Sequence, residues 1–469
     1  MLDHSNLMII GAIAFVALLY FLKTHDFRKN KLNTTPKKFV EKKTKKVSKE
    51  QAEGVAFGQS KKGILSTTKV TQSGANEEGH ILAVGGSGLG KTSALLIPTL
   101  LNWVKSKGTF LCWDISGDIH PHITSEDTKI IKYVVGEDGT IGYNPFGVID
   151  SAPTDRRKRK FLRQLAKILM PKPKESSEAG DYYHKQGLKM LTAALIAFYF
   201  EGLDFIEICM KVHDLNWHQL LNEIDRTGNE YAIRLINGFA DPDLPAQFTA
   251  SAKQNCEDAV ELFATDEDIQ EIVHRSSKGH LAWNPAHMEK NNIFIIIDDA
   301  DLEDYEQLNC LIANQCLQFI KKRPLSHKSN ILFCMDEAAS LGDIDILPPL
   351  RKFRKRHCRI FMLTQSIADI DLTWGEKQRK AMMTNFLYKV ILECSEPDEQ
   401  EYWSNLAGKS WMWHQSSRIQ HPEGYYTYDE LQQQENNIEP YTLSNLGDQL
   451  VLLSPDGAQV LDKGFYFKK

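Results

Sequence analysis

The feature that most constrains this 469-residue chain is a glycine-rich segment with the sequence Gly85-Gly86-Ser87-Gly88-Leu89-Gly90-Lys91-Thr92. It follows the apolar run Ile81–Gly85 and precedes the helical pattern SALLIPTLLNW, which is the strand–loop–helix context of a P-loop. Glycines allow backbone N–H groups to turn toward phosphate oxygens, and the helix adds the positive end of its dipole. The segment therefore predicts an ATP site, in which Lys91 contacts the β- and γ-phosphates and Thr92 binds Mg²⁺.

A second candidate for the same chemistry is an acidic strand end. The apolar run Ile331–Met335 is followed by Asp336 and Glu337. In a P-loop NTPase, Asp336 is expected to bind the Mg²⁺ shell and Glu337 to polarise the attacking water. Acidic residues also end strands for solubility alone. The run Ile293–Asp298, which continues into another aspartate, is a competing candidate that lacks further catalytic context.

Apolar runs recur along most of the chain and predict the fold class. They are Ile81–Gly85, Thr109–Trp113, Ile293–Asp298, Ile331–Asp336, Ile360–Thr364, Tyr388–Glu393 and Gln449–Leu453. They are continuous rather than alternating, which is typical of strands covered on both faces. With helical patterns between them, they predict an α/β fold of the P-loop NTPase class (RecA/FtsK-like), with a mostly parallel sheet.

The β signal disappears between about residues 148 and 279, where long helical patterns such as Asp181–Gly202 predict an inserted all-α domain. The expected organisation is a transmembrane anchor (1–25), a basic juxtamembrane linker (26–60), two parts of a nucleotide-binding domain (61–147 and 280–469) and the helical insert between them (148–279).

The run Leu7–Leu22 is uncharged and predicts a single transmembrane helix. Lysines crowd Lys23–Lys49, whereas neither Lys nor Arg precedes the run, so the bulk of the chain is expected in the cytoplasm. A cleaved signal peptide, the alternative, has its positive charge before the apolar run. The lysine-rich stretch is expected to meet anionic lipid, with a DNA-binding arm as the alternative.

Composition excludes two broad classes. The net charge of −5 does not suit a chain that binds nucleic acid over its whole surface. The eight cysteines form no CxxC pair and no spacing typical of zinc sites, and several lie in apolar runs. We therefore expect them to be buried, reduced thiols.

The order of several motifs resembles the TraG/TraD coupling-protein family of conjugative and type IV secretion systems. After the P-loop these motifs are WDISGDIHP (113–121), YNPF (143–146), MDEAASLGDI (335–344), LTQSIADIDLTWG (363–375) and an asparagine, Asn385, before the run YKVILE. The chain departs from the family where Ser116 replaces a lysine and Asp118 a glutamate. Ser116 cannot supply that lysine's charge.

The resemblance implies two further catalytic residues. Gln365 follows the strand expected beside Asp336, where an amide would sense the γ-phosphate or hold the lytic water; a helix-capping amide is the alternative. Arg354 matches the position of an arginine finger that reaches the neighbouring subunit's nucleotide, and Arg356 is its neighbouring alternative. A solvated basic face is the plain explanation of either arginine.

The resemblance also implies the function. It indicates an ATP- and Mg²⁺-dependent coupling protein of the bacterial inner membrane, a homo-hexamer that recruits DNA–relaxase or effector protein substrates and passes them to type IV secretion channel components. An FtsK/HerA-like DNA-pumping ring and a nucleotide-gated receptor without motor activity remain as alternatives. The basic cluster of residues 351–359 would contact a phosphate backbone in the pore of such a ring.

Overall fold

The computed structural model describes residues 43–60, 68–115, 117–123, 129–136, 140–174, 176–239, 246–277, 279–327, 329–419 and 426–467. They belong to one compact unit that begins at Lys43. The predicted anchor Leu7–Leu22 and Ser116 lie outside the described residues. Within these ranges, none of the helices combines the length and the apolar character that a membrane crossing requires.

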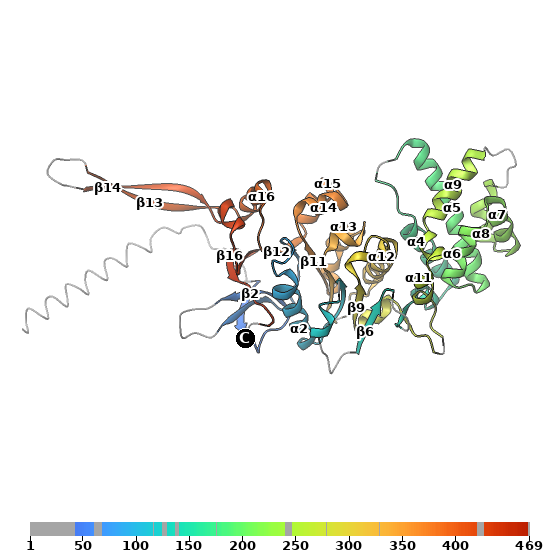
Figure 1. Cartoon of the computed structure of the whole chain (residues 1–469), viewed down its shortest axis with the longest axis horizontal. Helices are drawn as coiled ribbons and strands as arrows, with labels where there is room; N and C mark the ends of the chain where they lie inside the picture. The colour runs from blue at the N-terminus through green and yellow to red at the C-terminus, as the bar shows by residue number, and fades with distance from the viewer. Residues whose placement is uncertain are drawn as a thin grey trace, which may run out of the picture. The chain divides into compact units, whose positions relative to one another are not determined.

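A twelve-stranded sheet forms the centre of the described unit (Figure 1). The strands, in their order across the sheet, are β1 (Lys45–Ser48), β3 (Lys69–Ser73), β2 (Val55–Ser60), β16 (Gly457–Asp462), β15 (Gln449–Ser454), β12 (Phe386–Ile391), β4 (His80–Val84), β11 (Cys358–Thr364), β10 (Ile331–Met335), β5 (Thr109–Ile115), β9 (Asn291–Ile297) and β6 (Lys129–Val134). From β12 to β6 every neighbouring pair is parallel. The predicted α/β fold with a mostly parallel sheet is therefore confirmed.

Both faces of the parallel part are covered, because successive side chains of a strand point to opposite faces. In β4, Ile81 and Ala83 belong to one hydrophobic core, whereas Leu82 and Val84 belong to the other. The first core is closed by α2 (Ile97–Lys105) and the second by α12 (Glu306–Lys322). This double burial explains why the central strands appear in the sequence as continuous apolar runs.

The other helices beside the sheet are short. They are η1 (Thr92–Leu96), η2 (His120–His122), η4 (Pro285–Glu289), η5 (Asp299–Asp301), η6 (Ala338–Leu341), α13 (Leu347–Lys352), η7 (Phe353–Arg356), α14 (Ile367–Trp374), α15 (Glu376–Met383), α16 (Pro397–Ala407) and η8 (Pro440–Ser444).

The sheet continues past β12 with antiparallel strands, which bring the early and late parts of the chain together. β1 and β2 lie within residues 26–60, where the sequence indicated a linker. Here the structure differs from that expectation, because the compact unit already begins at Lys43. The strands are short, and β1 is largely exposed, so they lack the continuous apolar signal of the central strands.

Between β7 (Gly142–Tyr143) and β8 (Ala282–Trp283) the described chain is mainly helical, and these two short strands pair in parallel at its base. The helices, largely green in Figure 1, are α3 (Gly147–Asp150), α4 (Asp155–Leu169), α5 (Glu178–Glu201), α6 (Phe205–Asp214), α7 (Trp217–Arg226), α8 (Glu230–Ile236), η3 (Asn237–Phe239), α9 (Ala246–Asp258), α10 (Glu261–Thr265) and α11 (Glu267–Ile272).

The long helix α5 forms the centre of this segment and contacts α4, α6, α7, α8 and α9. Its ends are defined by local chemistry. The Ser177 side chain accepts a hydrogen bond from the Gly180 N–H at 3.0 Å, and Gly202 ends the helix with a φ of 96°.

The strands β13 (Lys409–Ile419) and β14 (Tyr426–Asn436) form a separate antiparallel ribbon that was not apparent from the sequence.

All eight cysteines are free, as the sequence indicated; seven are buried and Cys310 is half-buried.

Candidate functional site

The P-loop connects the carboxyl end of β4 to η1, and its glycines are required by its shape. Gly88 and Gly90 have φ angles of 74° and 93°, which side chains with a Cβ rarely adopt. A Cβ at Gly85 would lie 2.9 Å from the Leu392 Cβ, so the backbone packs closely there. At Gly90 a Cβ would also come within 3.0 Å of the Phe465 ring.

Lys91 is buried and its ammonium group lies inside the loop. Its Nζ donates hydrogen bonds to the Gly85 carbonyl at 2.7 Å and to the Gly86 carbonyl at 3.3 Å. The same Nζ lies 3.0 Å from Glu337 Oε1. The loop thus holds a positive charge at the place where the sequence predicts phosphate binding.

Thr92, at the start of η1, and Asp336, directly after β10, are in contact. The Thr92 hydroxyl donates a hydrogen bond of 3.0 Å to Asp336 Oδ2, whereas Asp336 Oδ1 is buried without a hydrogen-bond partner among the described residues. Burial, reinforced by the neighbouring Glu337 carboxylate, raises the pKa of Asp336 to about 6, against the opposing effects of the Thr92 hydrogen bond and Lys91. A buried carboxylate oxygen without a partner, beside a hydroxyl, fits a divalent cation.

The donor set suits Mg²⁺ in particular. Mg²⁺ usually binds through one or two carboxylates and substrate phosphates rather than through an all-protein cage. Within the described residues no group of three or more His, Cys, Asp or Glu side chains could hold a metal ion, which is compatible with such a site.

Glu337 follows Asp336 at the end of β10 and has the left-handed backbone angles φ 47° and ψ 55°. Such angles cost free energy for a residue other than glycine, and they concentrate at functional sites. The turn directs the Glu337 carboxylate to Lys91 rather than back along the strand.

These side chains open into one pocket of about 470 Å³. Its lining also includes residues that the sequence did not single out as site residues, namely Ser93, Ile97, Ile115, His122 and Tyr466. Tyr466 lies over the start of the helix after the P-loop, since its backbone N–H donates to the Ser93 carbonyl at 3.1 Å. Its hydroxyl lies 2.9 Å from His122 Nε2.

Asp114 at the end of β5 shapes the wall that carries His122. Its buried carboxylate accepts hydrogen bonds from the backbone N–H groups of Ile119 and His120, at 2.9 and 2.8 Å, and lies 2.9 Å from His120 Nδ1. The turn after β5 thereby brings Asp118 and His122 to the pocket. Asp118 therefore had a signal in the sequence, because it belongs to the WDISGDIHP motif (113–121), whereas His122 lies just after the motif and Tyr466 belongs to none.

The structure also separates the two acidic strand ends. Asp336 lines the pocket. Asp298 follows β9, and its side chain instead accepts a 3.0 Å hydrogen bond from the Ala300 N–H to cap η5 (Asp299–Asp301). Asp298 is absent from the pocket lining.

Gln365 and Asn385 lie outside this cluster. Gln365 follows β11 directly, next to the strand of the P-loop, but its side chain is exposed and does not line the pocket. Asn385 precedes β12 and donates a hydrogen bond of 2.7 Å to the Ala381 carbonyl, where it closes the end of α15.

Arg354 and Arg356 lie in η7, before β11, at the edge of the sheet opposite to the P-loop, because β11 and β4 are parallel. Arg354 is exposed and forms an ion pair with Glu78. Arg356 is half-buried and donates a hydrogen bond to the Arg323 carbonyl. Neither arginine lines the nucleotide pocket.

Two family models match the sequence. The model described as "Type IV secretory system Conjugative DNA transfer" matches residues 21–233, and the model described as "TraM recognition site of TraD and TraG" matches residues 330–447.

Curated relatives are consistent with these matches. The conjugal transfer protein TraG of Agrobacterium fabrum is 23% identical over 356 residues, which cover 70% of this chain and 51% of the relative. The type IV secretion system-coupling protein VirD4 of Bartonella henselae is 22% identical over 322 residues, which cover 63% of this chain and 48% of the relative. The chain thus spans about half the length of the curated relatives it matches.

Solved structures agree with the fold. The bacterial conjugative coupling protein TrwB superposes with a TM-score of 0.66 at 17% sequence identity, over 83% of this chain and 85% of that one. A structure of TrwB with the ATP analogue ADPNP gives a TM-score of 0.65 over 83% of this chain and 86% of that one. At this identity the likeness concerns the fold alone.

Proposed function

Because this chain belongs to the coupling-protein family of type IV secretion and conjugative DNA transfer systems, we propose that it is an ATP-driven motor that moves DNA–relaxase complexes or effector proteins toward a secretion channel. The observation that carries the proposal is the cluster of Lys91, Thr92, Asp336 and Glu337 in one pocket. TrwB, which shares the fold, has been solved with ADPNP and with ADP and Mg²⁺, which supports ATP and Mg²⁺ as the ligands here.

Each residue of the nucleotide pocket would have a separate role in ATP binding or hydrolysis. The Thr92 hydroxyl and the Asp336 carboxylate would hold Mg²⁺, which neutralises charge on the phosphate oxygens when it is bound. Lys91 would exchange the carbonyls of the loop and the Glu337 carboxylate for phosphate oxygens. Glu337, released from Lys91, would accept a proton from the attacking water. Gln365, one residue beyond the strand beside Asp336, is the second group proposed to orient that water.

The position of Arg354 supports a ring of subunits. An exposed arginine at the edge opposite to its own P-loop would act on a nucleotide only if it belonged to a neighbouring subunit. We therefore include a homo-hexamer in the proposal, with Arg354 as its arginine finger. The apolar run Leu7–Leu22 would anchor the ring in the bacterial inner membrane, with the described unit in the cytoplasm.

The test is a comparison of the full-length chain with its Glu337→Gln variant, for ATP hydrolysis and for transfer of a mobilisable plasmid. General-base loss should slow hydrolysis by roughly 10²–10⁴-fold and abolish transfer. Transfer at the wild-type level without hydrolysis would refute the motor and favour the nucleotide-gated receptor. Glu401→Gln, an exposed substitution on α16, is the matched control.

The dependence of ATP hydrolysis on DNA distinguishes DNA cargo from protein cargo. Hydrolysis by the wild-type chain would be measured with single-stranded DNA, with double-stranded DNA and without DNA, at two salt concentrations. Stimulation that weakens with salt indicates contact with phosphates, whereas an absence of stimulation indicates protein cargo. Stimulation by double-stranded DNA alone would favour the DNA-pumping alternative.

A further inference from the structure

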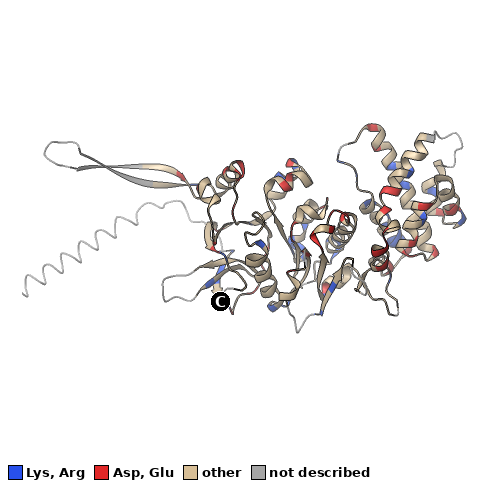
Figure 2. Ribbon diagram, viewed as in Figure 1, with Lys and Arg blue, Asp and Glu red and all other residues tan. Residues whose placement is uncertain are grey.

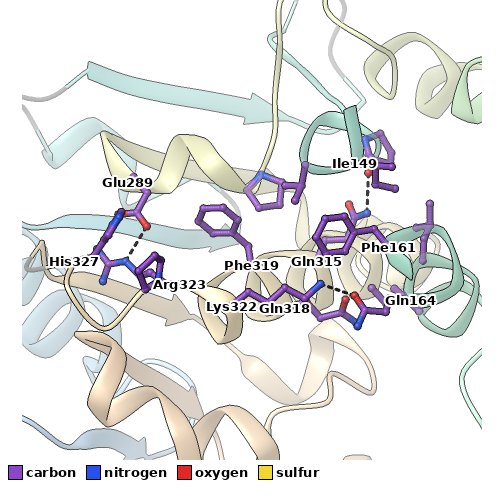
Figure 3. Close-up of a pocket in the computed structure, with 16 residues that line it drawn as sticks. Ile149, Phe161, Gln164, Glu289, Gln315, Gln318, Phe319, Lys322, Arg323 and His327 are labelled. Carbon is purple, nitrogen blue, oxygen red and sulfur yellow. Dashed lines mark hydrogen bonds and ion pairs between the residues drawn. The ribbon is translucent and has the colours of Figure 1, made fainter. Parts of the chain in front are cut away.

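A second pocket, separate from the nucleotide site, lies between the helical segment and α12 (Figure 3). Its volume is about 240 Å³, and its walls come from residues 145–149, α4, η4 and the end of α12. It shares no residue with the nucleotide pocket. Neither the proposed ATP hydrolysis nor the arginine finger gives it a role.

The interior of this pocket is apolar. Phe161, Leu165 and Ile168 of α4 face Phe319 of α12, and Figure 3 shows the two phenyl rings among the side chains that line it. A dry cavity of about 150 Å³ is known to accept a benzene ring in another protein. The volume here therefore suffices for one large aliphatic or aromatic side chain.

The rim carries positive charge. The Lys322 ammonium lies 3.7 Å from the centre of the Phe161 ring and donates a hydrogen bond of 2.5 Å to the Gln164 side chain. Its burial, together with the nearby Lys160 and Lys321, lowers the pKa of Lys322 to about 8. A ligand carboxylate at this point would relieve that repulsion.

The positive charge of Lys322 belongs to a larger excess of basic residues in this part of the chain. α4 contains seven basic residues and one acidic residue, and none of the seven forms an ion pair among the described residues. Figure 2 shows acidic and basic residues mixed over the helical segment as a whole, whereas the sequence of α4 and the last turn of α12 are predominantly basic. The surface around the pocket therefore favours an anionic partner.

The one carboxylate in the lining does not cancel this charge. Glu289 is already paired with the buried Arg323, whose Nε and Nη2 donate to its two oxygens at 2.8 Å each. Arg323 also donates to the carbonyls of Ser329 and Arg356, at 2.8 and 2.6 Å. This network fixes the wall of the pocket before a ligand arrives, which lowers the entropic cost of binding.

We propose that this pocket binds a short segment of a transferred or accessory protein in which a large apolar side chain is flanked by carboxylates. The apolar side chain enters between α4 and α12, and the carboxylates contact Lys322, Lys160 and Lys321. A nucleic-acid backbone would satisfy the lysines and leave the apolar interior empty, so a peptide matches both halves of the site. The nature of the partner as cargo or accessory protein rests on the proposed function, whereas the binding chemistry does not.

The experiment is a selection of random twelve-residue peptides, displayed on phage, against the full-length chain in detergent. Sequences that combine Asp or Glu with Phe, Leu or Trp should be enriched. A synthetic peptide of the enriched sequence should then lose at least tenfold in affinity for Lys322→Glu and keep its affinity for Lys377→Glu, an exposed control on α15. Thermal unfolding of both variants verifies that they are folded.

Three outcomes would overturn the inference: enrichment of no sequence, enrichment of basic sequences, or acidic binders whose affinity survives Lys322→Glu. A fourth is a tenfold loss of oligo(dT) affinity in Lys322→Glu without peptide enrichment, which would assign the site to nucleic acid. ATP hydrolysis by the same wild-type preparation tests the proposed function separately, because a chain can hydrolyse ATP without binding the peptides, and the reverse.

Discussion

The Lys91 ammonium lies 3.0 Å from the Glu337 carboxylate, so the group expected to bind phosphate is neutralised by the group expected to activate water. Both side chains must leave this pair before either can act on a nucleotide. The free energy of this ion pair therefore opposes the contacts that either side chain would make with ATP.

We predict that Glu337→Gln binds ATP more tightly than the wild-type chain while it hydrolyses ATP more slowly. Removal of one carboxylate releases Lys91 and removes a negative charge that faces the phosphates. An ion pair of this kind is worth about 1 kcal/mol, which corresponds to a three- to tenfold lower Kd. Calorimetric titration with ADPNP measures the change in Kd, and an unchanged or weaker affinity would show that the Lys91–Glu337 ion pair does not oppose ATP binding.

The stability of the nucleotide-free chain should depend on pH through Asp336. Its pKa is raised from 3.8 to about 6, so the folded state binds more protons than the unfolded state between these values. The favourable contribution is therefore complete below pH 4 and is lost as pH rises through 6. At about 1.4 kcal/mol per pKa unit, the loss is on the order of 3 kcal/mol.

Asp336→Asn isolates this contribution from that of other titrating groups. We expect the free energy of unfolding of the variant, relative to wild type, to increase by about 3 kcal/mol between pH 4 and pH 8 without Mg²⁺. Denaturant unfolding at several pH values measures this difference. A difference that is independent of pH would show that Asp336 titrates normally.

Tyr466 and His122 are the aromatic side chains of the nucleotide pocket lining, and we predict that they contact the base rather than the phosphates. Tyr466→Ala should raise the Kd for ATP up to about tenfold, because an aromatic contact is worth about 0.5–1.5 kcal/mol. The affinity for inorganic tripolyphosphate should not change. Fluorescence titration with both ligands measures this, with the exposed Tyr441→Ala as the control. Equal losses for both ligands would exclude a base contact.

We predict that substitution of Arg354 changes the rate of ATP hydrolysis, whereas substitution of Arg356 changes the stability of the fold. Arg354→Ala should slow ATP hydrolysis by roughly 10³-fold or more without a change in stability, because the side chain is exposed. Arg356→Ala should lower the free energy of unfolding by about 1–3 kcal/mol, because it removes the hydrogen bond to the Arg323 carbonyl.

Mixing tests the inter-subunit role of Arg354 directly. A mixture of Arg354→Ala and Glu337→Gln chains should regain hydrolysis that neither has alone, because some sites then combine an intact arginine with an intact glutamate. A mixture as inactive as its components would place the arginine outside the neighbouring site.

The sequence predicted the central fold because the strands β4, β5, β9, β10, β11 and β12 are buried on both faces, and burial of this kind leaves continuous apolar runs. The strands β1, β3 and β16 carry exposed residues and have no such signal. The strands β13 and β14 pair with each other in antiparallel register, and their sequences are polar along much of their length, so they have no continuous apolar signal.

The residues of the nucleotide pocket also differ in how clearly the sequence specifies them. Lys91, Thr92 and Asp336 were accessible from sequence because local motifs specify them, and the strand order β4–β11–β10 brings them together. Tyr466 reaches the pocket only through the antiparallel strands β15 and β16, a long-range pairing that no local pattern specifies. The roles of Gln365 and Arg354 stay predictions, since the first lies outside the pocket lining and the second acts only if a neighbour is present.

The cysteines have a practical consequence for measurements on this chain. Seven of the eight are buried, and burial raises the pKa of the half-buried Cys310 to about 12, so little thiolate is available to react in the folded protein. The native chain should therefore give a low background with maleimide dyes. A single cysteine introduced at an exposed position of η7 or at the rim of the second pocket could then be labelled selectively, without prior removal of native thiols, and its dye would report ligand binding or subunit contact at that position.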